Sequence, residues 1–132
     1  MRRHDGNTVG IASVARPTLV HIWATWCPPC RAELPGLLTL PSRHPVDVMA
    51  IALDDEWPDV AQFLGDISTT NVLLGDAGKV KRALGVRTLP VTFLVQPGGL
   101  ITLRFDGARD WTNASYVYSW TSIQKGKPSS LP

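Results

Sequence analysis

Two cysteines, Cys27 and Cys30, closely follow a nearly continuous apolar run, and this order of features constrains the fold more than any other in the sequence. The run covers residues 18–24, is rich in β-favouring side chains, and is typical of a strand buried on both faces. Pro28 and Pro29 separate the cysteines, where the first turn of a helix tolerates proline, and good helix formers follow. The sequence therefore predicts a central strand followed by a helix that the cysteine pair opens.

The rest of the chain alternates predicted strands and helices. We expect strands at residues 46–53, 71–74, 91–95 and 100–105, and helices at 59–64, 77–84 and about 110–124. Pro35 is expected to kink the cysteine helix and Pro41 to end it. Asp76 and Gly85 are typical of the start and end of the 77–84 helix. A helix joins the first two strands, which must then be parallel, and the last two form an antiparallel pair, so we predict a three-layer α/β sandwich around a mixed sheet.

We expect a single domain over residues 1–132, because 44% apolar content suffices for one core and no linker divides the chain. Asp5-Gly6-Asn7 is typical of a turn, and we interpret about residues 1–16 as the remnant of an N-terminal hairpin whose first strand is missing. Residues 125–132 predict a polar tail. No apolar stretch follows Arg2 and Arg3, so we expect a trimmed chain without a signal peptide.

Charge and cysteine content exclude several classes of protein. Thirteen basic and eleven acidic side chains leave a formal net charge of +2, too small and dispersed to indicate nucleic-acid binding. The longest apolar runs fall far short of the roughly 20 residues that a bilayer-spanning helix needs. Two cysteines are also too few for a disulfide-stapled scaffold or a four-cysteine zinc site.

The position of the cysteine pair indicates redox chemistry. At a helix start, the helix dipole and unpaired amides favour a thiolate on Cys27, which we predict to be the nucleophile. Cys30 lies further into the helix and is expected to be more buried, as suits the thiol that resolves a mixed disulfide. Pro28 and Pro29 have no amide hydrogen to donate to the Cys27 sulfur, which favours a reductant or mild exchanger over a strong oxidant.

Two simpler interpretations of the cysteine pair are weaker. A structural disulfide over so short a loop adds comparatively little stability. A zinc site would need histidines, but His4, His21 and His44 lack paired spacing, so we predict no metal.

Two segments resemble a known family. The sequence WATWCPPCRAELP at residues 23–35 is similar to the active-site signature of the thioredoxin superfamily, and most similar to its TlpA/ResA-like branch of bacterial extracytoplasmic thiol-disulfide oxidoreductases. The sequence GVRTLPVTFLV at residues 85–95 resembles the segment that holds the cis-proline of that family. The resemblance implies a thioredoxin-like fold with Cys27 as the attacking thiol and Cys30 as the resolving thiol.

The same resemblance implies a substrate surface and partners. Pro90 would follow a cis peptide bond, and the backbone of Leu89 would pair with an extended substrate segment. Trp26 and Pro28 are expected to belong to an apolar docking surface, although a tryptophan beside a strand can simply pack. The partners would be protein disulfides and a membrane thiol-disulfide electron donor, in the periplasm or an equivalent extracytoplasmic compartment. We expect a monomer without a cofactor.

Glu33 and His21 are left with open alternatives. Glu33 lies one turn after Cys30 and could accept its proton directly or through water, and the family resemblance implies such a role. Alternatively, Glu33 is an exposed first-turn residue favoured by the helix dipole. His21 occupies the strand position where thioredoxin has a buried aspartate; it could pass protons, but we favour a hydrogen-bonded core residue.

Three functions remain in competition. We favour a thiol-disulfide oxidoreductase that reduces protein disulfides through a Cys27–Cys30 cycle, with cytochrome c maturation or periplasmic thiol maintenance as processes that the resemblance allows. The alternative is a Cu(I)-binding chaperone that uses both thiolates. A peroxiredoxin-type peroxidase is weaker, since Ala24 stands where that family has threonine.

Overall fold

The computed structural model describes residues 1–3, 6–53, 56–67 and 70–112. Five strands form one mixed sheet in the order β3-β2-β1-β4-β5. The strands are β1 (Thr18–Trp23), β2 (Asp47–Ala52), β3 (Val72–Leu74), β4 (Val91–Val95) and β5 (Ile101–Asp106). β1 is parallel to β2 and antiparallel to β4, β2 is parallel to β3, and β4 is antiparallel to β5. β1 thus occupies the centre, as its apolar sequence predicts, because neither of its faces meets water.

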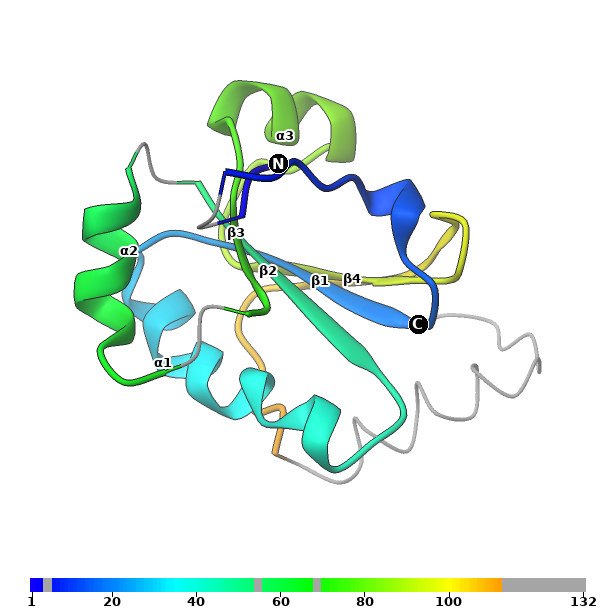
Figure 1. Cartoon of the computed structure of the whole chain (residues 1–132), viewed down its shortest axis with the longest axis horizontal. Coiled ribbons are helices and arrows are strands. Elements are labelled where there is room, and N and C mark those ends of the chain that lie inside the picture. The colour runs from blue at the N-terminus through cyan, green and yellow to red at the C-terminus, as the bar shows by residue number, and fades with distance from the viewer. Residues whose placement is uncertain (4–5, 54–55, 68–69, 113–132) are drawn as a thin grey trace.

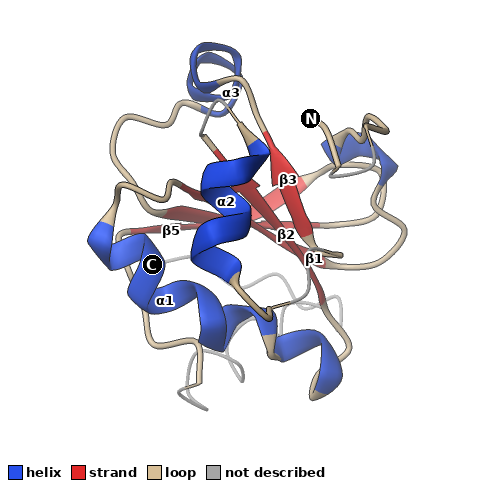
Figure 2. Cartoon of the chain, turned by 60° about the vertical axis from the view of Figure 1, so that its left-hand side comes forward, coloured by secondary structure: helices blue, strands red, loops and turns tan. Residues whose placement is uncertain are grey.

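Within the part of the chain that the structure describes, three α-helices cover the sheet, and each is close to a predicted one. They are α1 (Pro28–Leu38), α2 (Trp57–Leu64) and α3 (Ala77–Leu84), with short 3-10 turns at Ile11–Ser13 and Leu40–Ser42. Figures 1 and 2 show α3 on the opposite side of the sheet from α1 and α2. This arrangement confirms the three-layer α/β/α sandwich. Each described helix is too short or too polar to cross a membrane.

Helix ends agree with the sequence where capping residues mark them. In α3, the Asp76 carboxylate accepts a hydrogen bond of 2.9 Å from the Lys79 amide, and Gly85 ends the helix in the left-handed conformation, with φ of 64°. α2 begins at Trp57, two residues before its predicted start, because Pro58 fits the first turn of a helix instead of the preceding loop. α1 ends at Leu38, and Pro41 belongs to the 3-10 turn that follows. The sequence thus predicts the ends of α3, which polar and glycine caps mark, more closely than the start of α2 or the end of α1, where prolines are the signal.

Two isolated bridges hold the N-terminal segment. An isolated antiparallel bridge joins Arg2 to Thr8 across the turn, and a second joins Arg2 to Leu74 at the edge of the sheet. Asp5 of the predicted turn lies outside the described residues, and the interpretation of about residues 1–16 as the remnant of a hairpin stays a prediction. The predicted helix at about 110–124 lies outside the described residues beyond residue 112, and the predicted tail at 125–132 lies outside them entirely.

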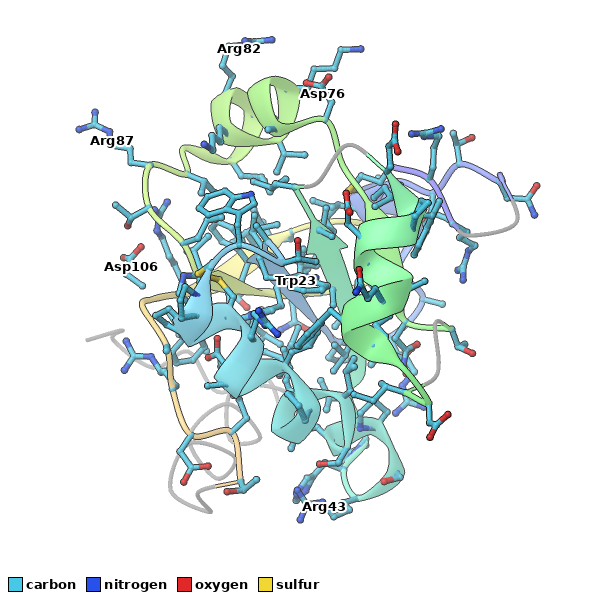
Figure 3. The ribbon with its side chains drawn as sticks, turned by 90° about the vertical axis from the view of Figure 1, so that its left-hand side faces the viewer. Trp23, Arg43, Asp76, Arg82, Arg87 and Asp106 are labelled. Atoms are coloured by element: carbon cyan, nitrogen blue, oxygen red, sulfur yellow. A yellow bond between two sulfur atoms is a disulfide. The ribbon has the colours of Figure 1, made fainter. Side chains whose placement is uncertain are left out.

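Two apolar clusters lie on the two faces of the sheet. The cluster under α1 and α2 includes Leu19, Trp23, both cysteines and Trp111. The cluster under α3 and the N-terminal segment includes members of the first four strands, of α3 and of the loops beside them. They are Val20, Ile22, Ile51, Leu53, Leu73, Val80, Val86, Val91, Phe93 and Val95. Trp23 lies in the interior, whereas Arg82, Arg87 and Asp106 lie at the surface (Figure 3). Successive residues of β1 and β4 alternate between the two clusters, as the period of a strand requires.

Candidate active site

The cysteine pair lies where the central strand β1 passes into α1. Cys27 is the N-cap residue of α1, with extended backbone angles of φ −104° and ψ 103°, and Cys30 belongs to the first turn. Pro28 and Pro29 occupy the first two helical positions, whose amides would have no partner inside the helix. This turn brings the two Cα atoms to 5.3 Å, and a disulfide joins the sulfurs. The structure therefore represents the oxidised state of the pair.

The two cysteines differ in exposure in the predicted direction. Cys27 retains 6% of its surface in contact with solvent, whereas Cys30 retains 0%. Of the two cysteines, Cys27 is therefore the more accessible to a disulfide from outside. Of the amides in the first turn, those of Pro28 and Pro29 are missing, so a thiolate at Cys27 depends on the Cys30 amide and on the helix dipole.

The residues around Cys27 form an exposed rim. Trp26 is 65% exposed, and Pro28 and Pro29 are exposed as well. Leu89 is half-buried and packs against the cluster that contains both cysteines. The peptide bond between Leu89 and Pro90 is cis, the isomer that the resemblance implied, and the Pro90 carbonyl accepts a hydrogen bond of 2.9 Å from the Gly107 amide.

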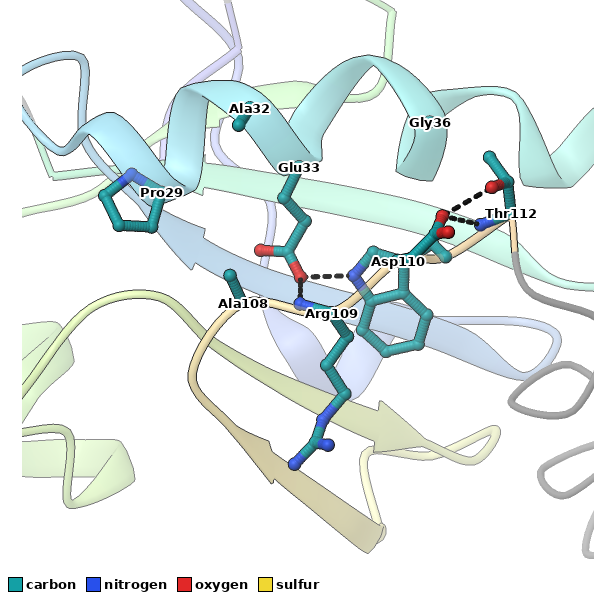
Figure 4. A pocket seen from close by; sticks show the side chains of 9 residues that line it. Pro29, Ala32, Glu33, Gly36, Ala108, Arg109, Asp110 and Thr112 are labelled. Carbon is teal, nitrogen blue, oxygen red and sulfur yellow. Dashed lines mark hydrogen bonds between the residues drawn. The ribbon is translucent and has the colours of Figure 1, made fainter.

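Glu33 is buried, which overturns the alternative of an exposed first-turn residue. It lies in the second turn of α1 and faces the chain that follows β5. There its Oε2 accepts hydrogen bonds from the Arg109 amide at 2.8 Å and from the indole N–H of Trp111 at 2.5 Å (Figure 4). A pocket of about 540 Å³ opens beside it, lined in part by Pro29, Ala32 and Glu33 itself. This pocket has room for several water molecules.

Burial shifts the acidity of Glu33 toward neutrality. Desolvation raises the pKa of Glu33 from its ordinary 4.5 to about 7, while the hydrogen bonds from Arg109 and Trp111 and the Arg109 charge lower the pKa and limit the shift. A carboxyl group with this pKa exchanges its proton close to neutral pH, where a general acid or base is most effective. Together with its position one turn after Cys30, this suits Glu33 to proton transfer.

His21 lies under α1 on the same face of the sheet as Glu33. Its Nδ1 is 2.8 Å from the Thr92 hydroxyl of the neighbouring strand β4, so the predicted hydrogen-bonded core histidine is confirmed. Its Nε2 is 3.4 Å from Glu33 Oε1, and these two atoms have no hydrogen-bond partner among the described residues. Complete burial lowers the pKa of His21 to about 3, so the pair is within ion-pair distance but the imidazole is neutral.

The described residues contain no cluster of three or more His, Cys, Asp or Glu side chains that could hold a metal ion. His21 is directed toward Glu33 and Thr92. His4, the first of the three histidines considered for zinc, lies outside the described residues.

Three residues of the site were not predicted from the sequence. Thr92 is a polar residue in the otherwise apolar strand β4, and this exception could have revealed it. Trp111 lies 78 residues from Glu33 along the chain, and Arg109 binds Glu33 through its backbone amide, which any residue other than proline possesses. Nothing in the sequence marks either of these two as a partner of Glu33.

Comparisons with known proteins show what this chain is similar to. The family model described as Redoxin matches residues 2–119. The chain is 30% identical over 109 residues to the thiol-disulfide oxidoreductase ResA of Oceanobacillus iheyensis, covering 79% of this chain and 57% of that protein. The chain spans between about half and two thirds of the length of the curated relatives it matches.

Two solved structures establish the fold. StoA from Bacillus subtilis superposes with a TM-score of 0.72 at 25% identity, covering 92% of this chain and 93% of StoA. The exposed lipoprotein thioredoxin Etrx1 from Streptococcus pneumoniae superposes with a TM-score of 0.68 at 19% identity, covering 90% of this chain and 96% of Etrx1. The predicted thioredoxin-like fold with a central mixed sheet is therefore confirmed.

Proposed function

Because this chain belongs to the Redoxin family, we propose that it is a thiol-disulfide oxidoreductase that reduces protein disulfides through a Cys27–Cys30 dithiol/disulfide cycle. The observation that carries the proposal is the disulfide at the start of α1, with a slightly exposed Cys27 and a fully buried Cys30. The thiol-disulfide oxidoreductase activity in the name of ResA supports it.

The cycle begins from the reduced pair. The Cys27 thiolate attacks one sulfur of a substrate disulfide, which forms a mixed disulfide and releases the other substrate sulfur as a thiolate. Cys30 then loses its proton and attacks Cys27 Sγ. The Cys27–Cys30 disulfide forms, the mixed disulfide breaks, and the substrate leaves as a dithiol that has gained two electrons. A thiol donor must return two electrons to the pair, and we assign this step to a membrane thiol-disulfide protein.

In this cycle Glu33 accepts the proton of Cys30, directly or through water in the adjacent pocket. Burial raises the pKa of its carboxyl group to about 7. Near neutral pH a substantial fraction of Glu33 is therefore ionised and can accept a proton, and the carboxylate is basic enough to bind it. Glu33→Gln keeps the shape but cannot accept a proton. We expect slower resolution of the mixed disulfide by about 10²-fold or more, the usual size of general-base effects.

We propose that Trp26, Pro28, Leu89 and Pro90 bind the substrate. The exposed ring of Trp26 offers apolar surface beside Cys27, and Leu89 packs against the cluster that contains both cysteines. Trp26→Ala should raise KM for a protein disulfide while leaving kcat and the free energy of unfolding nearly unchanged.

We further propose that residues 1–132 act as a monomeric single domain in the periplasm or an equivalent compartment.

The direct test is reduction of insulin disulfides with a small dithiol as electron source. Cys27→Ser should abolish turnover, and Cys30→Ser should stop at a mixed disulfide with the substrate, visible as a covalent adduct by mass spectrometry. Absence of exchange by the unmodified protein, together with tight stoichiometric Cu(I) binding, would instead support the chaperone alternative.

The direction of electron flow is tested by titrating the pair against glutathione. A reductase should have a potential near that of thioredoxin, about −270 mV, whereas a value near about −120 mV, typical of the strongest oxidising enzymes, would rule out the reductase.

A further inference from the structure

The buried side of the site ends in two polar atoms that face each other. Glu33 Oε2 already accepts two hydrogen bonds, from Arg109 and Trp111, whereas Oε1 faces His21 Nε2 at 3.4 Å. The His21 and Glu33 side chains are 0% and 1% exposed, so water cannot readily separate them. Two lone pairs facing each other in such a place would be unfavourable, so a proton must lie between these atoms.

We propose that His21 is a positioning residue that exchanges its two neutral tautomers as Glu33 gains and loses a proton, with Thr92 as the partner that permits both. When Glu33 is protonated, its O–H at Oε1 donates to Nε2, and the Nδ1–H of His21 donates to the Thr92 hydroxyl oxygen. When Glu33 is ionised, Nε2–H donates to Oε1, and the Thr92 hydroxyl donates to Nδ1. The imidazole carries one proton in both states.

The proton balance of this exchange closes. On ionisation, the Oε1–H and Nδ1–H bonds break, the Nε2–H bond forms, and one proton leaves the pair. Thr92 can serve in both states because a hydroxyl both donates and accepts, and its oxygen lies 2.8 Å from Nδ1. The distance of 3.4 Å between Nε2 and Oε1 needs to shorten by only about a few tenths of an ångström to become an ordinary hydrogen bond.

Other polar and charged groups lie near the pair. Arg109 lines the same pocket and carries a guanidinium group. Asp110 also lines the pocket, and hydrogen bonds from Thr112 hold its pKa below the ordinary value, so it is ionised while Glu33 titrates. Cys30, on the same helix, cannot titrate while the disulfide is intact. β1 and β4 contribute His21 and Thr92, and β2 places the apolar Ala50 beside His21.

The exchange explains how a buried carboxyl can serve as a base at all. When Glu33 is ionised, its Oε1 still accepts a hydrogen bond from His21 Nε2–H, and the imidazole stays neutral. A positive charge on His21 would be unfavourable because the side chain is buried. The benefit to catalysis, faster acceptance of the Cys30 proton, rests on the proposed function. The tautomer exchange itself does not, because it occurs in the oxidised chain without any substrate.

The test is nuclear magnetic resonance of the full, oxidised, isotope-labelled chain between pH 5 and pH 9. The nitrogen shifts of the His21 ring should show the proton on Nδ1 at low pH and on Nε2 at high pH, with the same midpoint as the Glu33 carboxyl carbon. Glu33→Gln is the matched control, because its amide donates to Nε2 as protonated Glu33 does. His21 should then keep its proton on Nδ1 at every pH.

A second variant tests the consequence for Glu33. His21→Leu removes the donor to ionised Oε1, so the Glu33 midpoint should rise by roughly one pH unit, a tenfold change in the ratio of ionised to protonated Glu33. A single His21 tautomer throughout the Glu33 titration, or a cationic His21 near pH 7, would overturn the proposal, and both are readable in the unmodified chain even where His21→Leu does not fold. Since insulin reduction is measured separately, an inactive chain with exchanging tautomers would refute the proposed function alone.

Discussion

The two faces of the same strands have different contents. In β1, Leu19, His21 and Trp23 lie toward α1, whereas Val20 and Ile22 lie toward α3. In β4, Thr92 and Leu94 lie toward α1, and Val91, Phe93 and Val95 toward α3. Apart from Thr18, which bonds the Arg16 carbonyl at the start of β1, the buried polar side chains among the described residues are His21, Glu33 and Thr92, all on the α1 face.

This difference separates stability from chemistry within one small sheet. Among the described residues, the buried side chains on the α3 face are all apolar. The α1 face buries a carboxyl group and an imidazole beside the cysteine pair, which costs stability but provides a proton acceptor. Substitutions on the α3 face should therefore alter stability alone, and those at the polar cluster should alter titration behaviour.

The largest effect is expected on the α3 face. Ile22→Ala removes a fully buried side chain next to His21 in sequence but on the opposite side of the sheet. We expect the free energy of unfolding to fall by about 2 to 5 kcal/mol, because transfer energy is lost and a cavity remains. Denaturant titration measures the loss, and the Glu33 midpoint should stay near pH 7; a midpoint that moves by a unit would contradict the separation of the faces.

Glu33→Gln should change the pH dependence of stability. The pKa of Glu33 is raised from 4.5 to about 7 by folding, so the folded chain holds a proton that the unfolded chain has lost between these values. The free energy of unfolding of the natural chain, compared with that of the variant, is therefore highest below about pH 4.5. This relative stability is lost as pH rises through 7. The difference should reach at most about 3 kcal/mol, because water in the open pocket screens the charge.

Unfolding curves of both proteins at pH 5, 6, 7 and 8 measure this difference. His21 has the opposite influence, since its lowered pKa makes the chain less stable as pH falls below the ordinary value of 6.5. Both proteins contain His21, so the difference between them isolates Glu33. A difference that does not vary with pH would refute the raised pKa.

Trp111→Phe should sharpen the comparison within the polar face. The substitution keeps an aromatic ring beside Phe105 but removes the indole N–H that donates to Glu33 Oε2 at 2.5 Å. The ionised form loses a donor, so the pKa of Glu33 should rise, by roughly one unit or about 1.4 kcal/mol. Carboxyl carbon shifts measure the midpoint, and a lower or unchanged midpoint would show that the indole does not stabilise the ionised form.

The smallest effect is expected at the start of α3. Asp76→Ala removes the cap that binds the Lys79 amide and should cost about 1 kcal/mol of stability. Asp76→Asn, which can still cap the helix, is the matched control. Insulin reduction by folded Asp76→Ala should equal that of the natural chain, and slower exchange by the folded variant would show that the α3 face influences the site.

Local patterns along the chain were sufficient to predict most of the fold. The apolar run of β1, the cysteine pair and the capping residues of α3 each report on their own neighbourhood, because strand burial, helix starts and helix caps depend on residues a few positions apart. Errors occurred where local signals compete, as at Pro58, which suits both a turn and a first helical turn.

The sequence by itself determined the chemistry of the site, namely two thiols at a helix start with a glutamate one turn later. Only the tertiary structure decided the state of that glutamate. Whether Glu33 is exposed or buried depends on Arg109, Trp111 and His21, which are distant in sequence and meet it only when the chain folds. The physical reason is that a pKa reflects solvation and hydrogen bonding in space, and these are properties of the packed molecule rather than of its local sequence.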